Sequence, residues 1–136
     1  MNKKSWVTAS IAVFVVVTIL EFIYNSYCLK GIYAATANLW RPEADIMKLM
    51  PYYWAASFIA SFFFVYIYTK GYEAKPNKIA EGFRFGATVG LFVNLPTATI
   101  VYATMPVPLN LPVDWFITGL VQYIVAGVVV GLIYKR

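Results

Sequence analysis

The sequence predicts an all-α membrane protein, a bundle of four transmembrane helices with a short interfacial helix in its first outer loop. Hydrophobic residues make up 61% of the 136 residues and charged residues 12%, whereas soluble domains are about 45–50% apolar and about 25% charged. Four continuous apolar stretches cover about 5–29, 51–69, 83–105 and 113–134. Each matches the ~20 residues that cross a bilayer core as a helix. Residues 1–136 therefore form a single integral membrane domain.

The first stretch is expected to be a retained helix. Two lysines, an apolar run and small residues near 35–37 imitate a signal peptide. The apolar run is too long for one, however, and Glu21 and Asn25 interrupt its end.

Positive charges predict the orientation. If the four stretches alternate in direction, eight of the eleven Lys and Arg residues lie on one side of the membrane. The positive-inside rule then places both termini and the loop 71–82 in the cytoplasm. Because the net charge of +5 resides at the segment ends, nucleic-acid binding is not expected.

Glu21 is the one ionisable residue well inside an apolar stretch. A carboxylate there costs several kcal/mol unless it is paired, hydrated or protonated. Two interpretations stay open: a functional site, or a hydrogen-bonded residue that locks helices together. Depth along alternating helices predicts an intramembrane polar cluster near it. Its members are Glu21, Asn25, Ser57, Asn94, Thr97 and Gln122.

Glycines recur at four-residue spacing in the third and fourth stretches. Small residues on one face allow two helix backbones to approach closely in lipid. The spacing therefore predicts that these two stretches pack together, with a homodimer as the alternative. The packing positions are Gly82, Gly86, Gly90, Gly119, Gly127 and Gly131.

Pro96 interrupts the third stretch. A proline inside a helix removes one hydrogen bond and displaces the carbonyl four residues earlier, here that of Phe92. The sequence thus predicts a kink that opens a small outward-facing cavity beside the level of Glu21. Thr97 and Thr99 are expected to compensate for the lost bond.

The first outer connection carries the predicted interfacial helix. Pro42 suits a first helical position, acidic residues follow in the first turn, and Pro51 is expected to end the helix. Arg41 is expected to reach Glu43, Asp45 or a lipid phosphate. The outer-loop motif consists of Trp40, Arg41, Pro42 and Glu43.

A second polar motif begins the third stretch. Asn77 is a suitable N-cap, so this helix is expected to start in the cytoplasm. Glu81 and Arg84 are three residues apart and are expected to pair on the helix surface. Lys75 and Lys78, together with Arg84, would attract anionic headgroups.

The composition excludes most familiar catalytic chemistry. The chain has no histidine and one cysteine, so no Ser-His-Asp or Cys-His pair can form and an intrachain disulfide is impossible. Phosphate-binding and dinucleotide-binding loops are also absent. We therefore expect no catalytic residues, no metal site and no cofactor, and the protein is predicted not to be an enzyme.

Several short motifs resemble a family of small bacterial four-helix inner-membrane proteins. They are Leu39-Trp40-Arg41-Pro42-Glu43-Ala44, Glu81-Gly82-Phe83-Arg84-Phe85-Gly86 and the Met105-Pro106-Val107-Pro108 turn followed by Trp115. The similarity spans nearly the whole chain. It implies the four-helix fold, bacterial origin and inner-membrane location, and it implies no activity.

Two functional hypotheses follow from the sequence. The leading one is a small non-enzymatic membrane protein of structural or accessory type that binds membrane lipid, a second copy or a larger membrane complex. The alternative is an oligomeric protein for permeation or transport of a proton or small solute, using Glu21 and the kink at Pro96. An enzyme acting on lipid through Glu21, Arg41 and Asp45 is a remote third option.

Overall fold

The computed structural model describes residues 1–136 as an all-α fold. Its helices are α1 (Lys3–Ile23), α2 (Lys30–Ala35), α3 (Glu43–Lys70), α4 (Lys78–Thr104) and α5 (Asn110–Ile133). A π-helical turn, Tyr24–Cys28, extends α1. This extended α1, α3, α4 and α5 are long and apolar enough to cross a membrane, which confirms the four predicted apolar helices.

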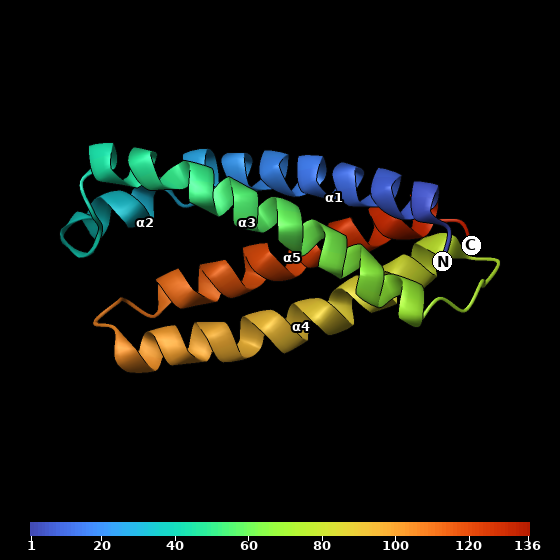
Figure 1. The fold of residues 1–136 in the computed structure, drawn as a ribbon. Coiled ribbons are helices and arrows are strands. Elements are labelled where there is room, and N and C mark those ends of the chain that lie inside the picture. Colours follow the sequence, from blue (N-terminus) through green and yellow to red (C-terminus); the bar gives the residue numbers. More distant parts are fainter.

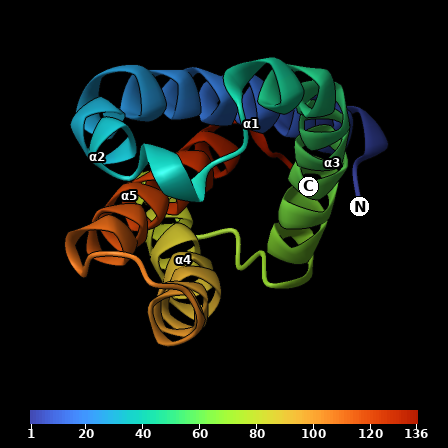
Figure 2. The same cartoon turned by 90° about the vertical axis from the view of Figure 1, so that its left-hand side faces the viewer.

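The long helices lie side by side, with both termini at one end and α2 at the other (Figure 1). We call these the terminal end and the α2 end. Figure 2, seen from the α2 end, shows α1 and α3 as one pair and α4 and α5 as another. Helix α1 joins the pairs because it contacts both α3 and α5, whereas the main backbone contact of α4 is with α5.

The glycines of α4 and α5 form the closest helix contact, which we call the glycine seam. A Cβ placed on Gly82 would overlap the carbonyl of Gly127, and one placed on Gly86 would overlap the carbonyl of Tyr123. Only glycine permits this approach without moving a backbone. The predicted packing of these two helices is therefore confirmed, and it occurs within one chain.

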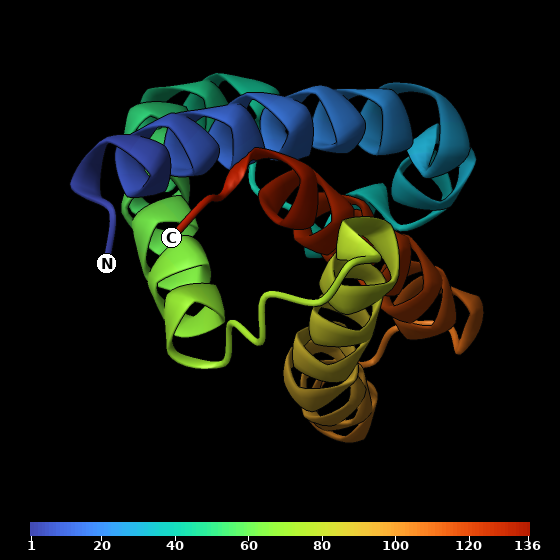
Figure 3. The same cartoon turned by 90° about the vertical axis from the view of Figure 1, so that its right-hand side faces the viewer.

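The connecting loop 71–77 crosses the space between α3 and α4 (Figure 3). Aromatic side chains of the two helices contact each other in this space. The ring centroids of Phe64 and Phe85 lie 4.8 Å apart, and those of Tyr68 and Phe85 lie 5.1 Å apart. The largest buried core occupies the terminal half. It consists of Ala9, Val13, Phe64, Val65, Tyr68, Ala126, Val130 and Tyr134.

The surface is predominantly apolar. Only 21 of 136 residues are buried, while large side chains such as Phe22, Phe63 and Phe92 are more than half exposed. Exposing such a large apolar surface to water is unfavourable, whereas contact with lipid chains is favourable.

The predicted interfacial helix over 42–50 is wrong. Residues 43–50 form the first turns of α3, which continues through Pro51 to Lys70. Proline removes one hydrogen bond, whereas ending the helix would leave several backbone groups unbonded in apolar surroundings. The short helix of this connection is instead α2, which is followed by a 3₁₀ turn at Ala37–Leu39.

Helix α4 also continues through its proline, Pro96. The hydroxyl of Thr97 donates to the carbonyl of Val93, and that of Thr99 donates to the carbonyl of Leu95. Neither reaches the carbonyl of Phe92, so the expected compensation is not the one that forms. Each threonine hydroxyl instead donates to the backbone carbonyl four residues before it in α4.

Candidate functional site

The carboxylate of Glu21 connects three helices. The hydroxyl of Tyr53 on α3 donates a hydrogen bond to its Oε1, and the Nε2 of Gln122 on α5 donates to the same oxygen at 3.1 Å. Both donors stabilise negative charge on that oxygen. The second oxygen, Oε2, accepts no hydrogen bond from the protein. No basic side chain forms an ion pair with Glu21.

Glu21 and Gln122 separate two cavities. The inner cavity, of about 220 Å³, extends from Glu21 towards the terminal end. It is lined by Val13, Val17, Glu21, Tyr53, Ser57, Ala60, Ser61, Phe64, Gln122, Tyr123 and Ala126. The outer cavity, of about 150 Å³, extends from the same two side chains towards the α2 end. Glu21 is thus accessible from two sides.

The inner cavity ends at the buried core of the terminal half. Val13, Phe64 and Ala126 belong both to its lining and to that core. Beyond them Ala9, Val65 and Val130 leave essentially no accessible surface. In this structure the pair of cavities is therefore a site that is closed towards the terminal end.

Polar and aromatic residues surround the outer cavity. The Nδ2 of Asn25 donates to the carbonyl of Glu21 at 2.8 Å, and its Oδ1 accepts from the hydroxyl of Tyr33 at 2.9 Å. The Nε1 of Trp115 in turn donates to that hydroxyl at 3.0 Å. Burial raises the pKa of Tyr33, and the hydrogen bond from Trp115 opposes the rise. This chain of contacts ties α1, α2 and α5 together beside Glu21.

The π-helical turn lies directly beyond Glu21. The amide of Leu29 donates to the carbonyl of Tyr24, five residues earlier. Such turns widen a helix locally and are frequent at functional sites. Here the turn carries Tyr24 and Asn25, both of which line the outer cavity.

The structure brings together part of the predicted polar cluster. Glu21, Ser57 and Gln122 line the inner cavity, and Asn25 lines the outer one. Asn94 lies elsewhere: its Nδ2 donates to the carbonyl of Gly90, and its side chain covers Gly119 in the glycine seam. Thr97, like the adjacent Pro96, lines neither cavity. No residue of α4 lines either cavity, so the prediction that the kink at Pro96 opens the cavity beside Glu21 is wrong.

Sequence reasoning missed the aromatic half of the site. Tyr53 lies one helical turn before Ser57 on the same helix face, so its depth in the membrane also predicts a position near Glu21. Tyr33 and Trp115 lie where interfacial aromatic residues are common. Their role depends on how α2 folds back, which no local pattern indicates.

The outer-loop motif lies at the start of α3. Pro42 is the N-cap and Glu43 the first helical residue. Trp40 donates from its Nε1 to the hydroxyl of Thr36 at 2.9 Å and lies 5.9 Å from the Trp115 ring. Arg41 forms no ion pair with Glu43 or Asp45, and the carboxylate of Asp45 contacts Lys48 at 3.5 Å instead.

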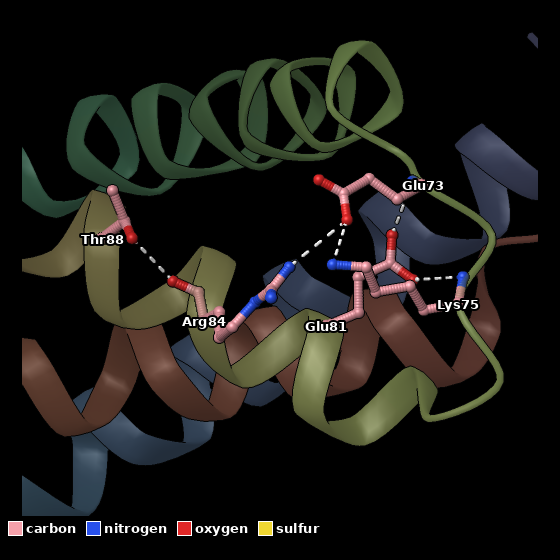
Figure 4. A network of polar contacts seen from close by, with 5 residues as sticks. All are labelled: Glu73, Lys75, Glu81, Arg84 and Thr88. Carbon is pink, nitrogen blue, oxygen red and sulfur yellow. Dashed lines mark hydrogen bonds and ion pairs between the residues drawn. The ribbon is translucent and has the colours of Figure 1, made fainter.

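The predicted surface pair of Glu81 and Arg84 is wrong (Figure 4). Glu81 is only 5% exposed, and its two oxygens accept from the amides of Glu73 and Lys75 at 2.9 and 3.3 Å. Arg84 instead contacts the carboxylate of Glu73 at 3.5 Å. The loop folds over the helix start, so Glu81 fastens the loop. Asn77 is the N-cap as predicted and accepts from the amide of Ala80.

Comparison with family models, with curated proteins and with solved structures found no match. No group of three or more His, Cys, Asp or Glu side chains is arranged to hold a metal ion.

Proposed function

We propose that the chain is a non-enzymatic, multi-pass membrane protein that binds a small, positively charged solute at Glu21. The observation that carries this proposal is the free oxygen of the Glu21 carboxylate. Glu21 lines both cavities, and its other oxygen is held by Tyr53 and Gln122. A carboxylate in apolar surroundings is costly to bury without a counter-charge, and no side chain supplies one.

The predicted orientation gives the direction of access. With both termini in the cytoplasm of a bacterium, the α2 end faces outward from the inner membrane. The outer cavity then admits the solute from outside, and the buried core closes the site towards the cytoplasm. The resemblance seen in the sequence motifs supports the bacterial inner membrane as the location.

The chemistry around Glu21 suits an organic ammonium ion. Cations bind favourably over aromatic faces, the more so where water is excluded. The inner cavity, which begins at the carboxylate, is lined by the aromatic residues Tyr53, Phe64 and Tyr123. At about 220 Å³ it lies below the ~300–1,000 Å³ of drug-sized sites, so the solute is small.

The proposal is tested by titrating the protein in lipid nanodiscs with tetramethylammonium while tryptophan fluorescence is recorded, because Trp115 lines the outer cavity. tert-Butanol is the neutral ligand of similar shape. We expect Glu21→Gln to weaken tetramethylammonium binding about ten- to a hundredfold, the effect of removing an interaction with a charged partner. Glu43→Gln, an exposed acid at the start of α3, is the matched control and should leave the affinity unchanged.

Two outcomes would reject solute binding at Glu21. One is equal binding of tetramethylammonium and tert-butanol, and the other is equal loss of affinity in both Glu→Gln variants. Transport is a separate claim, because it requires the core around Val13 and Val65 to open. Flux of tetramethylammonium into proteoliposomes, measured for the parent and for Glu21→Gln, distinguishes a transporter from a protein that only binds.

A structural or accessory role is the second candidate, and the glycine seam favours it. Two helices packed closely through the glycine seam form a rigid body suited to attachment to lipid or to a larger membrane complex. This role predicts that Glu21→Gln lowers stability without any change in binding of small cations. The titration above therefore decides between the two candidates.

A further inference from the structure

A separate pocket lies at the terminal end, between the last turn of α3 and the first turns of α4. Its volume is about 240 Å³. It is lined by Tyr68, Gly71, Glu81, Arg84, Phe85 and Thr88. None of these residues lines the two cavities at Glu21, so its chemistry is independent of the proposed function. We call it the interhelical pocket.

One residue that lines this pocket, Tyr68, has a buried hydroxyl with no hydrogen-bond partner. The residue is only 2% exposed, and its hydroxyl is the one buried side-chain polar atom in the chain that has no hydrogen-bond partner. A buried hydroxyl without a partner costs about 1–3 kcal/mol. Since Tyr68 lines the pocket, a ligand with a hydrogen-bond acceptor would remove that cost.

Arg84 supplies the second donor. Its side chain is 60% exposed and makes one long contact, at 3.5 Å, with the carboxylate of Glu73. Glu73 also pairs with the ammonium of Lys75 (Figure 4). Lys75 therefore neutralises Glu73 even when Arg84 turns away, and most of the guanidinium N–H groups remain available.

The buried acid of the pocket, Glu81, is turned towards the loop. Both oxygens of Glu81 are occupied by loop amides, those of Glu73 and Lys75. Around them the sequence is basic, because residues 70–84 contain four Lys or Arg and two Glu. The local charge thus favours a ligand with negative charge.

We propose that the interhelical pocket binds a phosphate group, and specifically that of an anionic phospholipid in the leaflet at the terminal end. The planar guanidinium of Arg84 matches phosphate oxygens bidentately, and the Tyr68 hydroxyl donates to a third. The backbones of α3 and α4 have few contacts with each other, so a lipid can approach the pocket between them from the side. Basic residues at this level attract anionic headgroups.

The test measures phosphatidylglycerol bound to the detergent-purified protein by native mass spectrometry. Arg84→Gln should weaken binding about ten- to a hundredfold. Lys70→Gln removes the same charge at the same level but outside the pocket, so it should weaken binding no more than about fivefold. Glu73→Gln should strengthen binding, because it releases Arg84.

Tyr68→Phe separates a ligand role from a structural one. It should weaken phosphatidylglycerol binding about three- to tenfold, while the melting temperature stays equal or rises because an unsatisfied hydroxyl is removed. If the hydroxyl had only a structural role, stability would fall and lipid affinity would not change, which would overturn its assignment as a phosphate ligand.

A further comparison identifies whether the bound phosphate group belongs to a lipid or to free phosphate. Phosphatidylcholine should bind more weakly than phosphatidylglycerol, and inorganic phosphate at millimolar concentration should not displace the lipid. Displacement that depends on Arg84 would identify free phosphate as the ligand and overturn the lipid assignment. Equal losses in Arg84→Gln and Lys70→Gln would show that only general surface charge is involved, and the pocket would be rejected.

Discussion

Replacement of Gly127 by alanine tests whether the glycine seam stabilises the fold. A Cβ at this position lies 2.8 Å from the Cα and the amide nitrogen of Gly86 and closer still to the carbonyl oxygen of Gly82. Ordinary Cβ contacts are 3.4–4 Å. All three neighbours are helix backbone, so no side-chain rotation can relieve the overlap. Helices α4 and α5 must move apart along the whole seam.

The expected cost follows from two opposing effects. Overpacking a tight interface costs about 1–3 kcal/mol, and this overlap with rigid backbone belongs at the upper end. Alanine is a better helix former than glycine by up to about 1 kcal/mol. We therefore expect Gly127→Ala to lower the free energy of unfolding by about 2 kcal/mol, equivalent to about thirtyfold in the unfolding equilibrium.

The assay is equilibrium unfolding in mixed micelles, with increasing mole fraction of SDS, followed by circular dichroism. Gly31→Ala in α2 is the matched control, because no neighbouring heavy atom lies within 4 Å of a Cβ added at this position. This substitution should be neutral or stabilising. Gly119→Ala should be intermediate, since it meets only the side chain of Asn94, which can rotate. A Gly127→Ala variant as stable as Gly31→Ala would refute the seam as a stabilising contact.

Four further outcomes follow from the site and the loop. Glu81→Gln should lower the free energy of unfolding by about 1–3 kcal/mol and speed hydrogen exchange of the amides of Glu73 and Lys75. Ala74 has a left-handed backbone, with φ of 54°, so Ala74→Gly should stabilise the protein by about 0.5–1 kcal/mol in the same SDS assay. Lys75, more than Arg84, holds the pKa of Glu73 below its usual 4.5. The ion pairs of Glu73 should therefore stabilise the loop above pH 4.5 and be lost as the pH falls through the lowered pKa. Melting curves of the parent and of Glu73→Gln, recorded over this pH range, test the prediction. Pro96→Ala should leave tetramethylammonium affinity unchanged in the nanodisc titration, because Pro96 lines neither cavity.

The seam could be predicted because its signal is local and periodic. Glycines four residues apart lie on one helix face whatever surrounds the helix, so Gly82 and Gly86 indicate a contact before its partner is known. Glu21 was predictable for a similar reason, since an acid in an apolar run needs partners. Which partners it finds depends on helix rotation, and the sequence pattern did not determine that for Tyr53 or Thr97.

Two wrong predictions have the same cause. In each, a rule based on local sequence was outweighed by the surroundings of the residue in the fold. Glu81 and Arg84 have the spacing of a surface ion pair, but the loop 71–77 folds over the helix start and offers amides to the buried acid. Pro51 has the position of a helix stop, but the apolar setting makes an ended helix costlier than one missing bond. In both cases the deciding groups lie outside the window of sequence in which the rule applies.

Helix α5 couples the seam to the Glu21 site through Tyr123. Its carbonyl packs against Gly86 in the seam, while its side chain lines the inner cavity with Gln122. Moving α5 at the seam must therefore shift the cavity wall. We expect Gly86→Ala to weaken tetramethylammonium binding although it changes no lining residue, in the same nanodisc titration. Glu21→Gln removes a charge at the cavity, so it should leave α4 and α5 packed, and cross-linking of cysteines introduced along the seam should proceed as in the parent. Equal tetramethylammonium affinity in Gly86→Ala and the parent would show that the cavity is independent of the seam.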